Sequence, residues 1–310
     1  MPRVAVFCPH PLLTVTIEDP GNGDDVHVHA GGQGVWASRM AGELGAEPVL
    51  CGFLGGETGA VLAPLLRRLP GEQRLVPTAG ASGAYVVDRR DGRRRAVAQA
   101  VSPPPSRHEL DALVTTMVAA SLECDAAFIG NGFPADVLAP EVYGTIAADV
   151  RGARPDVPVL ADLSSPRLDA VLGAEPDLVK LNEWELAEYV TGPVDSPALA
   201  LAAAERLRAA GARSVLVTRG GEPALWLHGD AAPQTVAPPR FEQGSAEGCG
   251  DTMMGAISAA VAAGRPLAEA VVLGTAAGAA NFLHAGLGSG DRGSVERLAA
   301  QVQVGPYPAG

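Results

Sequence analysis

Lysine is almost absent from this sequence of 310 residues, and cysteine and aromatic residues are scarce. Lys180 is the only lysine among 23 lysine and arginine residues, which draws attention to its position; chance survival at a strand end is the alternative reading. The cysteines Cys8, Cys51, Cys124 and Cys249 are widely spaced. Their spacing predicts neither a zinc site nor a framework of disulfide bonds.

The sequence also lacks a long apolar run and an excess of positive charge. No uninterrupted apolar stretch approaches the ~18 residues that a membrane-spanning helix needs, and no charged-then-apolar leader stands at the N-terminus. The formal net charge of −12 argues against a surface for nucleic acid or anionic membranes, which needs clustered lysine and arginine. We therefore expect a soluble, cytoplasmic protein that binds neither nucleic acid nor membranes.

One dense basic run covers residues 89–95 and is interrupted by Asp91 and Gly92. An Asp-Gly pair favours a tight turn between two strands, so the run is typical of a hairpin tip. The pattern favours a solvated tip, and a lid that touches an anionic ligand is the alternative.

Most of the chain alternates between short buried-type strands and helical stretches. The predicted core strands cover residues 4–7, 48–51, 126–129, 157–161, 178–180 and 214–218. The predicted helices cover about residues 34–45, 58–69, 107–121, 136–152, 183–190, 196–211, 250–263 and 267–285. This order implies right-handed crossovers, and hence a doubly wound, mostly parallel sheet flanked by helices. We expect one α/β domain over residues 1–310, with a tail at 305–308 that frays or lies extended.

Four extended runs do not alternate with helices and predict a small antiparallel sheet apart from the main body. They cover residues 12–17, 26–29, 84–87 and 94–99, so this lid comes from about residues 12–30 and 83–100. Exposed strand edges pair readily with another chain. We therefore expect a homodimer through the lid strands.

A glycine turn at residues 248–250 runs into a helix that carries Asp251 at its mouth. The glycines Gly248 and Gly250 let successive N–H groups around Cys249 point at one anion, and the helix dipole adds to the same positive potential. Asp251 would repel a bound phosphate. It suits a base that takes a proton from a hydroxyl group while the amides hold the charge of a transferred phosphoryl group. The turn therefore predicts a kinase active site.

Other glycine groups follow strands or precede helices at residues 31–34, 55–59 and 219–221. In a doubly wound sheet, ligands bind outside the carboxyl ends of the strands. These groups could therefore meet the turn at 248–250 in one crevice.

Five segments in this order resemble the ribokinase and phosphofructokinase-B family of carbohydrate kinases, nearest the 1-phosphofructokinase and tagatose-6-phosphate kinase branch. The segments are residues 30–59, 162–165, 180–185, 217–221 and 248–255. Five matching segments in sequence are far more specific than any single glycine-rich loop.

The resemblance implies a ribokinase-like fold with a small β-sheet lid and transfer of the γ-phosphoryl group of ATP, with Mg²⁺, to a hydroxyl group. It makes Asp251 the base and the amides of Gly248, Cys249 and Gly250 the anion hole. Phosphoryl transfer of this kind needs alignment, charge stabilisation and one proton acceptor. Glu185 would organise Mg²⁺ through water, because Mg²⁺ keeps several waters; an exposed acid in a first helical turn is the alternative.

The resemblance also assigns residues to the nucleotide and to the acceptor. The nucleotide residues are Lys180, Asn182, Thr218, Gly220, Gly278 and Asn281, with adenine between residues 236–239 and the small-residue helix at 276–281. The acceptor residues are Thr14, Gly31, Gly32, Gln33, Trp36 and Arg39. Pro223 replaces a glycine that is usual in the nucleotide loop.

The acceptor side departs from the family more than the nucleotide side. The aspartate usual after the first strand is missing from residues 8–14. The phosphosugar branch usually has lysine where Gln33 stands and asparagine where Trp36 stands. We therefore expect an acceptor that differs from fructose 1-phosphate, fructose 6-phosphate and tagatose 6-phosphate, and we expect these three to be poor substrates.

Three alternatives to a sugar-type kinase remain. A nucleoside kinase of the same fold would use Trp36 as a stacking platform. A non-catalytic sugar-binding or regulatory homologue would have little reason to keep Asp251 and Lys180. A nicotinamide dehydrogenase is disfavoured because the first strand runs into Pro9 and Pro11 rather than a Gly-x-Gly-x-x-Gly turn. The sequence does not identify the acceptor.

Overall fold

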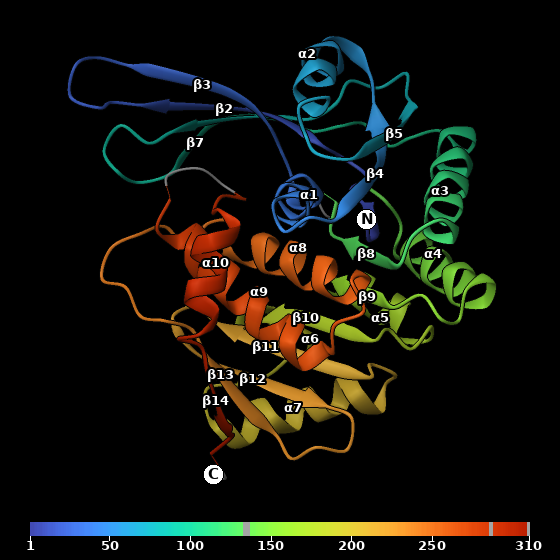
Figure 1. The fold of residues 1–310 in the computed structure, drawn as a ribbon. Helices are drawn as coiled ribbons and strands as arrows, with labels where there is room; N and C mark the ends of the chain where they lie inside the picture. The colour runs from blue at the N-terminus through green and yellow to red at the C-terminus, as the bar shows by residue number, and fades with distance from the viewer. Residues whose placement is uncertain (133–136, 285–287, 309–310) are drawn as a thin grey trace.

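The computed structural model describes residues 1–132, 137–284 and 288–308, and its main body is a large twisted sheet between two helical layers (Figure 1). The sheet has the strand order β14-β13-β12-β11-β10-β9-β8-β1-β4-β5. The strands are β1 Arg3–Phe7, β4 Glu47–Leu54, β5 Glu72–Pro77, β8 Ala126–Gly130, β9 Val159–Asp162, β10 Leu178–Asn182, β11 Ser214–Arg219, β12 Glu222–His228, β13 Gln234–Ala237 and β14 Gln303–Pro306. The neighbours β11, β10, β9, β8, β1, β4 and β5 pair in parallel, and β12, β13 and β14 add antiparallel pairs at one edge.

Helices cover both faces of this sheet because its central strands are apolar on both sides. One core contains Leu113, Ile146 and Leu207 from the layer α3 Arg107–Leu122, α4 Pro140–Ala153, α5 Arg167–Leu172, α6 Glu183–Val190 and α7 Pro197–Ala209. The other contains Met40 and Met254 from the layer α1 Gln33–Glu43, α2 Gly56–Leu66, α8 Cys249–Ala262, α9 Leu267–Phe282 and α10 Arg292–Ala299. The predicted doubly wound fold is confirmed.

Glycine lets α1 and α8 pack closely, side by side over the sheet (Figure 1). A Cβ atom added to Gly255 would lie 2.3 Å from the carbonyl oxygen of Ala37, a separation that real Cβ atoms do not show. Gly34 brings α1 equally close to β1, because an added Cβ atom would lie 2.4 Å from Cβ of Cys8. The N-terminal ends of the two helices are therefore held in a fixed relation.

A second sheet projects from the body as a lid with the strand order β3-β2-β6-β7 (Figure 1). Its strands are β2 Leu12–Glu18, β3 Asp25–Gly31, β6 Ala84–Asp88 and β7 Arg95–Ala100. The outer pairs β2–β3 and β6–β7 are antiparallel, as predicted, whereas the central pair β2–β6 is parallel. The lid sheet is therefore mixed.

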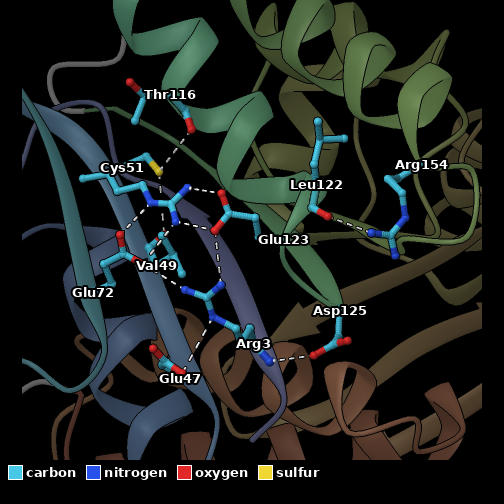
Figure 2. A network of polar contacts seen from close by, with 11 residues as sticks. Arg3, Glu47, Val49, Cys51, Glu72, Thr116, Leu122, Glu123, Asp125 and Arg154 are labelled. Atoms are coloured by element: carbon cyan, nitrogen blue, oxygen red, sulfur yellow. Dashed lines mark hydrogen bonds and ion pairs between the residues drawn. The ribbon is translucent and has the colours of Figure 1, made fainter.

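A network of ion pairs joins the first residues of strands in the main sheet (Figure 2). Arg3 of β1 lies 2.8 Å from the carboxylate of Glu72 on β5 and 3.4 Å from that of Glu123 after α3. Arg74 of β5 joins the same two carboxylates at 2.8 and 2.6 Å. The side chains are only partly buried, so each pair contributes little alone, but together they connect β1, β5 and α3.

Six elements lie outside the sequence prediction: β5, β12, β13, β14, α5 and α10. The tail does not fray, because β14 pairs with β13 and the Tyr307 hydroxyl donates to the carbonyl of Pro197 at 3.2 Å. Two predicted helix bounds, at residues 136 and 285, lie outside the described residues. No helix in the described part of the chain combines the length and the apolar character needed to cross a membrane.

Candidate active site

The glycine turn before α8 lies at the carboxyl side of the parallel strands. Gly248 has a φ of 72° and caps α8, which begins at Cys249. This left-handed conformation is strained for residues with a side chain. The N–H groups at residues 249–251 belong to the first turn of α8, where a helix leaves N–H groups without a partner inside the helix. The N–H group of Cys249 makes a long hydrogen bond of 3.4 Å to the carbonyl of Ala246. Asp251 stands in the same turn.

Asp251 is a partly buried carboxylate whose environment favours its protonated form. Burial, and the nearby carboxylates of Asp162 and Glu185, raise its pKa to about 6, although Lys180 and a hydrogen bond from Gln33 act in the opposite direction. A carboxyl group with this pKa is mostly ionised at neutral pH and remains basic enough to accept a proton. Asp251 can therefore act as a general base.

Lys180 is buried beside the turn and pairs with Asp162. The two residues are register partners on the parallel strands β10 and β9, and Nζ of Lys180 lies 3.0 Å from Oδ2 of Asp162. Burial lowers the pKa of Lys180, but Asp162, Glu185 and Asp251 outweigh it and raise that pKa. A Cβ atom added to Gly250 would lie 2.7 Å from Nζ. The ammonium group therefore stands against the anion-binding turn.

Asp162 is the functional residue that the sequence reading did not single out. It ends β9, is 1 % exposed and holds the ammonium group of Lys180. The sequence did contain a signal for Asp162, because a carboxylate at the end of a buried strand needs a hydrogen-bonded or oppositely charged partner. The adjacent strand carries the one lysine of the chain.

Asn182 and Glu185 form a capping box at the start of α6. The Asn182 side chain accepts hydrogen bonds from the N–H groups of residues 184 and 185, and Glu185 accepts one from Asn182 at 2.7 Å. Burial and Asp162 raise the pKa of Glu185. No cluster of three or more His, Cys, Asp or Glu side chains suited to a metal ion occurs within the described residues. The carboxylate of Glu185 is thus partly occupied by the cap of α6.

A cavity of about 500 Å³ lies between the strand ends and α9. Its polar lining includes Lys180, Asn182, Thr218, Arg219, Glu222 and Arg240, with Gly220 and Gly250 beside them. Its apolar lining includes Ala224, Val236, Pro238, Pro239, Phe241, Met253, Ala279 and Phe282. A cavity with both kinds of lining beside the start of a helix suits a ligand with an anionic part and an apolar part, such as a nucleotide. Gly278 lines the cavity, as predicted from the resemblance.

Asn281 is buried behind the turn instead of facing this cavity. The side chain is 1 % exposed, and its Nδ2 atom donates to the carbonyl of Glu247 at 2.8 Å. Its Oδ1 atom accepts from the N–H group of Ser289 at 3.1 Å. Asn281 therefore braces the chain just before Gly248 rather than touching a ligand.

A second cavity of about 380 Å³ lies under the lid. Its lining residues are Thr14, Thr16, Glu18, His27, Val28, His29, Trp36, Arg39, Val87, Arg89, Arg94 and Glu247. Five of these side chains are arginine or histidine. Burial is the largest cause that lowers the pKa of His29, to about 4, so this imidazole is neutral at neutral pH. The three guanidinium groups supply the positive charge.

The basic hairpin has the solvated tip that was predicted, because residues 90–95 are exposed. Arg89 and Arg94 also line the cavity. Arg94 forms an ion pair with Glu247, immediately before Gly248, and its guanidinium group lies 4.8 Å from the ring centre of Tyr85. Arg94 therefore joins the lid to the chain that enters the glycine turn.

Trp36 fills space beside this cavity. It is 5 % exposed. The guanidinium carbon of Arg39 lies 4.9 Å from the Trp36 ring centre, and the His29 ring lies 5.6 Å from it. Gly31 makes room for this packing, because an added Cβ atom would lie 2.4 Å from Oγ1 of Thr14 and 3.2 Å from the indole. With so little of its ring surface exposed, Trp36 does not favour the alternative in which it stacks on a nucleoside base.

Gln33 turns toward the main sheet. It follows Gly32, which caps α1 with a φ of 109°. The Oε1 atom of Gln33 accepts a hydrogen bond from the backbone N–H group of Asn131 at 2.5 Å. Gln33 also lowers the pKa of Asp251. The structure therefore places Gln33 near Asp251.

Residues 12–292 match the family described as pfkB family carbohydrate kinase. The 1-phosphofructokinase of Vibrio cholerae is 26% identical over 91% of this chain and 88% of its own length. That of Rhodobacter capsulatus is 28% identical over 88% of each chain. Among solved structures, phosphofructokinase-2 from Escherichia coli in complex with potassium has a TM-score of 0.84 at 22% identity, covering 97% of this chain and 99% of its own. Arabidopsis thaliana ribokinase, complexed with ribose and ATP, has a TM-score of 0.73 at 20% identity, covering 96% and 98%.

Proposed function

Because the chain belongs to the pfkB family of carbohydrate kinases, we propose that it transfers the γ-phosphoryl group of ATP to a hydroxyl group of an anionic, sugar-type acceptor, with Asp251 as the base. One observation carries this proposal. The chain from Glu247 to Gly250 borders both cavities, since Glu247 lines the lid cavity while Cys249 and Gly250 line the other. A donor and an acceptor in the two cavities would therefore meet at Asp251.

The residues at this junction divide the work of the reaction. Asp251 takes the proton of the acceptor hydroxyl. The acceptor oxygen forms a bond to the γ-phosphorus, and the bond between that phosphorus and the leaving oxygen of ADP breaks. The N–H groups of Gly248, Cys249 and Gly250, together with the ammonium group of Lys180, face the negative charge on the moving phosphoryl group. This arrangement needs no covalent intermediate on the protein.

The larger cavity would hold ATP with its base among the apolar residues near Val236 and Phe282, and its phosphates near Lys180, Thr218 and Gly220. Mg²⁺ would be held mainly by phosphate oxygens and water. Glu185 would then act through water, because its carboxylate already accepts the N–H group of Asn182. Bound Mg²⁺ would neutralise phosphate charge.

The lid cavity would hold the acceptor, and its arginines favour an acceptor with a phosphate or carboxylate group. Arg39, Arg89 and Arg94 line this cavity together with the carboxylates of Glu18 and Glu247. Guanidinium groups recognise phosphate and carboxylate with paired hydrogen bonds, and the carboxylates could accept from sugar hydroxyls. Thr14 and Gly31 would form the wall between the lid and α1.

We further propose that residues 1–310 act as one unit and that lid strands join two copies in a homodimer. Strand β7 is exposed along its whole length, and the first residues of β3 are exposed as well. Such edges are open to pairing. Sedimentation analysis of the wild-type chain, beside a variant with a proline in β7, tests this assembly.

A screen of ATP consumption tests the proposed function. The acceptors are neutral sugars, sugar phosphates, sugar acids and nucleosides, each with wild-type protein and with Asp251→Asn as the blank. We expect turnover with an anionic sugar derivative, and little with fructose 1-phosphate, fructose 6-phosphate or tagatose 6-phosphate. Efficient use of any of these three would show that Gln33 and Trp36 do not change acceptor choice. Turnover confined to nucleosides would overturn the sugar assignment.

A further inference from the structure

We propose that Glu247 is a specificity-determining residue of the lid cavity, where its carboxylate holds Arg94 until an anionic group of the acceptor displaces it. The ligand class that can break this ion pair is a phosphate or carboxylate compound. This inference rests on the proposed function, because it concerns the cavity assigned to the acceptor. It adds that the empty cavity is occupied by an anion of the protein itself.

The lid cavity carries carboxylates that pair with its own arginines. Arg94 and Glu247 both line the cavity and form an ion pair with each other. Nη1 of Arg89 lies 3.8 Å from Oε1 of Glu18, which is a looser pair in the same lining. Guanidinium groups bind phosphate and carboxylate ligands with the same N–H donors that they use for these side chains. An anionic ligand therefore has to compete with Glu247 for Arg94.

The pair between Arg94 and Glu247 is open enough for a ligand to reach. The two side chains are 39 % and 21 % exposed, whereas those of the buried pair Lys180 and Asp162 are 7 % and 2 % exposed. An exposed ion pair contributes little net free energy, because water solvates both charges when they separate. Exchange of Glu247 for a ligand anion therefore costs far less than separation of a buried pair.

Arg94 has a second support that remains when Glu247 leaves. The guanidinium carbon of Arg94 lies 4.8 Å from the centre of the Tyr85 ring, which is the geometry of a cation–π interaction. Tyr85 is on β6, and Arg94 directly precedes the neighbouring strand β7. The lid itself therefore keeps this cation in the cavity.

The glycine turn also has supports that do not involve the Glu247 carboxylate. The backbone carbonyl of Glu247 accepts a hydrogen bond from Nδ2 of Asn281 at 2.8 Å, and its N–H group donates to Oγ of Ser245 at 3.4 Å. Asn281 is buried on α9. These contacts hold the main chain before Gly248. The carboxylate can therefore leave Arg94 while the turn keeps its shape.

Charge decides which ligands displace Glu247 from Arg94. A neutral hydroxyl group offers a guanidinium group a weaker hydrogen bond than a carboxylate does, so a neutral sugar leaves the pair intact. A phosphate group can bond to two guanidinium donors at once and carries at least as much charge as the carboxylate. Glu247 therefore disfavours neutral acceptors relative to anionic ones.

Binding of inorganic phosphate tests this inference without an acceptor or ATP. Isothermal titration calorimetry at fixed ionic strength compares the wild-type chain with Glu247→Gln, which keeps the size of the side chain and removes its charge. We expect Glu247→Gln to bind phosphate about fivefold more tightly, because one competing ion pair is lost. The control is Glu242→Gln, the same change at an exposed residue of the same loop that lines neither of the two cavities. It should bind phosphate as the wild-type chain does.

The same substitution in an Arg94→Met background shows whether the effect passes through Arg94. We expect Glu247→Gln to change phosphate affinity by less than about twofold there, because the cation for which the two anions compete is absent. Phosphate bound beside Lys180 on the nucleotide side would respond to neither substitution, so the difference between the variants reports the lid cavity. Glu18→Gln should tighten binding less than Glu247→Gln, since its pair with Arg89 is looser.

Equal tightening in both backgrounds would show that Glu247 acts only through the overall charge of the cavity, and the proposal would be wrong. A phosphate affinity of Glu247→Gln that equals or falls below that of the wild-type chain would overturn it as well. If phosphate binding follows the expected cycle but no acceptor is phosphorylated, the proposed function fails while the competition for Arg94 stands. If an acceptor is phosphorylated but Glu247→Gln leaves phosphate affinity unchanged, the function stands and this inference fails.

Discussion

The cavity proposed for the nucleotide and the lid cavity proposed for the acceptor border the same turn, yet their charged side chains are paired in different ways. On the nucleotide side, Lys180 and Asp162 form a buried pair on neighbouring parallel strands. On the acceptor side, Arg94 and Glu247 form a pair that is partly exposed, between a lid hairpin and the catalytic turn. Buried pairs are fixed by the core around them, whereas exposed pairs can exchange partners with a ligand.

This difference fits the tasks of the two cavities. A nucleotide donor, as proposed, would be the same in every turnover, so a rigid set of strand ends suits it. The acceptor must enter and leave beneath a lid, and its identity varies among related kinases. Two of the three arginines of the lid cavity come from a hairpin, and Trp36 forms part of its wall. Substitutions at these positions can change the ligand of the cavity without a change in the main sheet.

The largest expected effect is the loss of the base, which both cavities share. Asp251→Asn keeps the shape of the side chain but cannot accept a proton, so turnover should fall about 10²–10⁴-fold, with native unfolding behaviour. ATP consumption with the best acceptor measures this. Asp291→Asn, the same change at the N-cap of α10, should keep full activity. Near-normal turnover of Asp251→Asn would remove it from the mechanism.

The next effect tests whether the nucleotide side depends on a buried pair. Lys180→Met leaves Asp162 buried without its cation, which should cost about 3–5 kcal/mol of unfolding free energy, in addition to most of the turnover. Urea unfolding measures the cost. The double variant Lys180→Met with Asp162→Asn removes both charges and should recover much of the stability but none of the activity. Equal stability of the single and double variants would contradict the coupling.

Much of the fold could be predicted because the central strands carry their own signal. Parallel strands buried on both faces appear as continuous apolar runs, and those at residues 4–7, 126–129 and 214–218 are of this kind. Among the strands that were not predicted, β5, β13 and β14 contain Pro, Gln, Glu or Thr and lack such runs. Pairing with a neighbour, rather than their own pattern, makes these three segments strands. Strand β12 does carry a buried apolar run at residues 224–227, but it pairs antiparallel with β11 and so stands outside the alternation of strands and helices.

The candidate site shows the same division. Asp251 and its glycine turn are contiguous in sequence, so local chemistry was enough to predict a base there. The hydrogen bond between Gln33 and Asn131, in contrast, joins residues that lie 98 positions apart in the sequence. No local pattern indicates such a contact. The role of Asn281, turned to brace residue 247, was hidden for the same reason.

A third prediction concerns the acceptor side alone. Arg94→Met removes one cation from the lid cavity, so the acceptor KM should rise about tenfold, in line with the loss of one charge-assisted hydrogen bond, with a smaller change in the KM for ATP. Arg93→Met, at the exposed tip of the same hairpin, is the matched control and should change neither constant. Steady-state kinetics with both substrates varied separates the two cavities. An equal effect of Arg93→Met would show that the hairpin acts through overall charge only.

The smallest expected effect is on stability. It tests whether ionisation of the buried Asp251 carboxyl group destabilises the folded protein. Burial is the main cause that raises the pKa of Asp251 to about 6, above its unfolded value near 3.8. The folded state then favours the protonated form, so this contribution is complete below pH 3.8 and is lost as pH rises through 6. Asp251→Asn is neutral throughout. Its unfolding free energy, relative to wild type, should therefore be higher at pH 8 than at pH 4.5, as measured by urea unfolding at the two values. A difference independent of pH would mean that ionised Asp251 is as well solvated in the folded protein as in the unfolded chain, and that the turn, Lys180 and Gln33 together fully offset its burial.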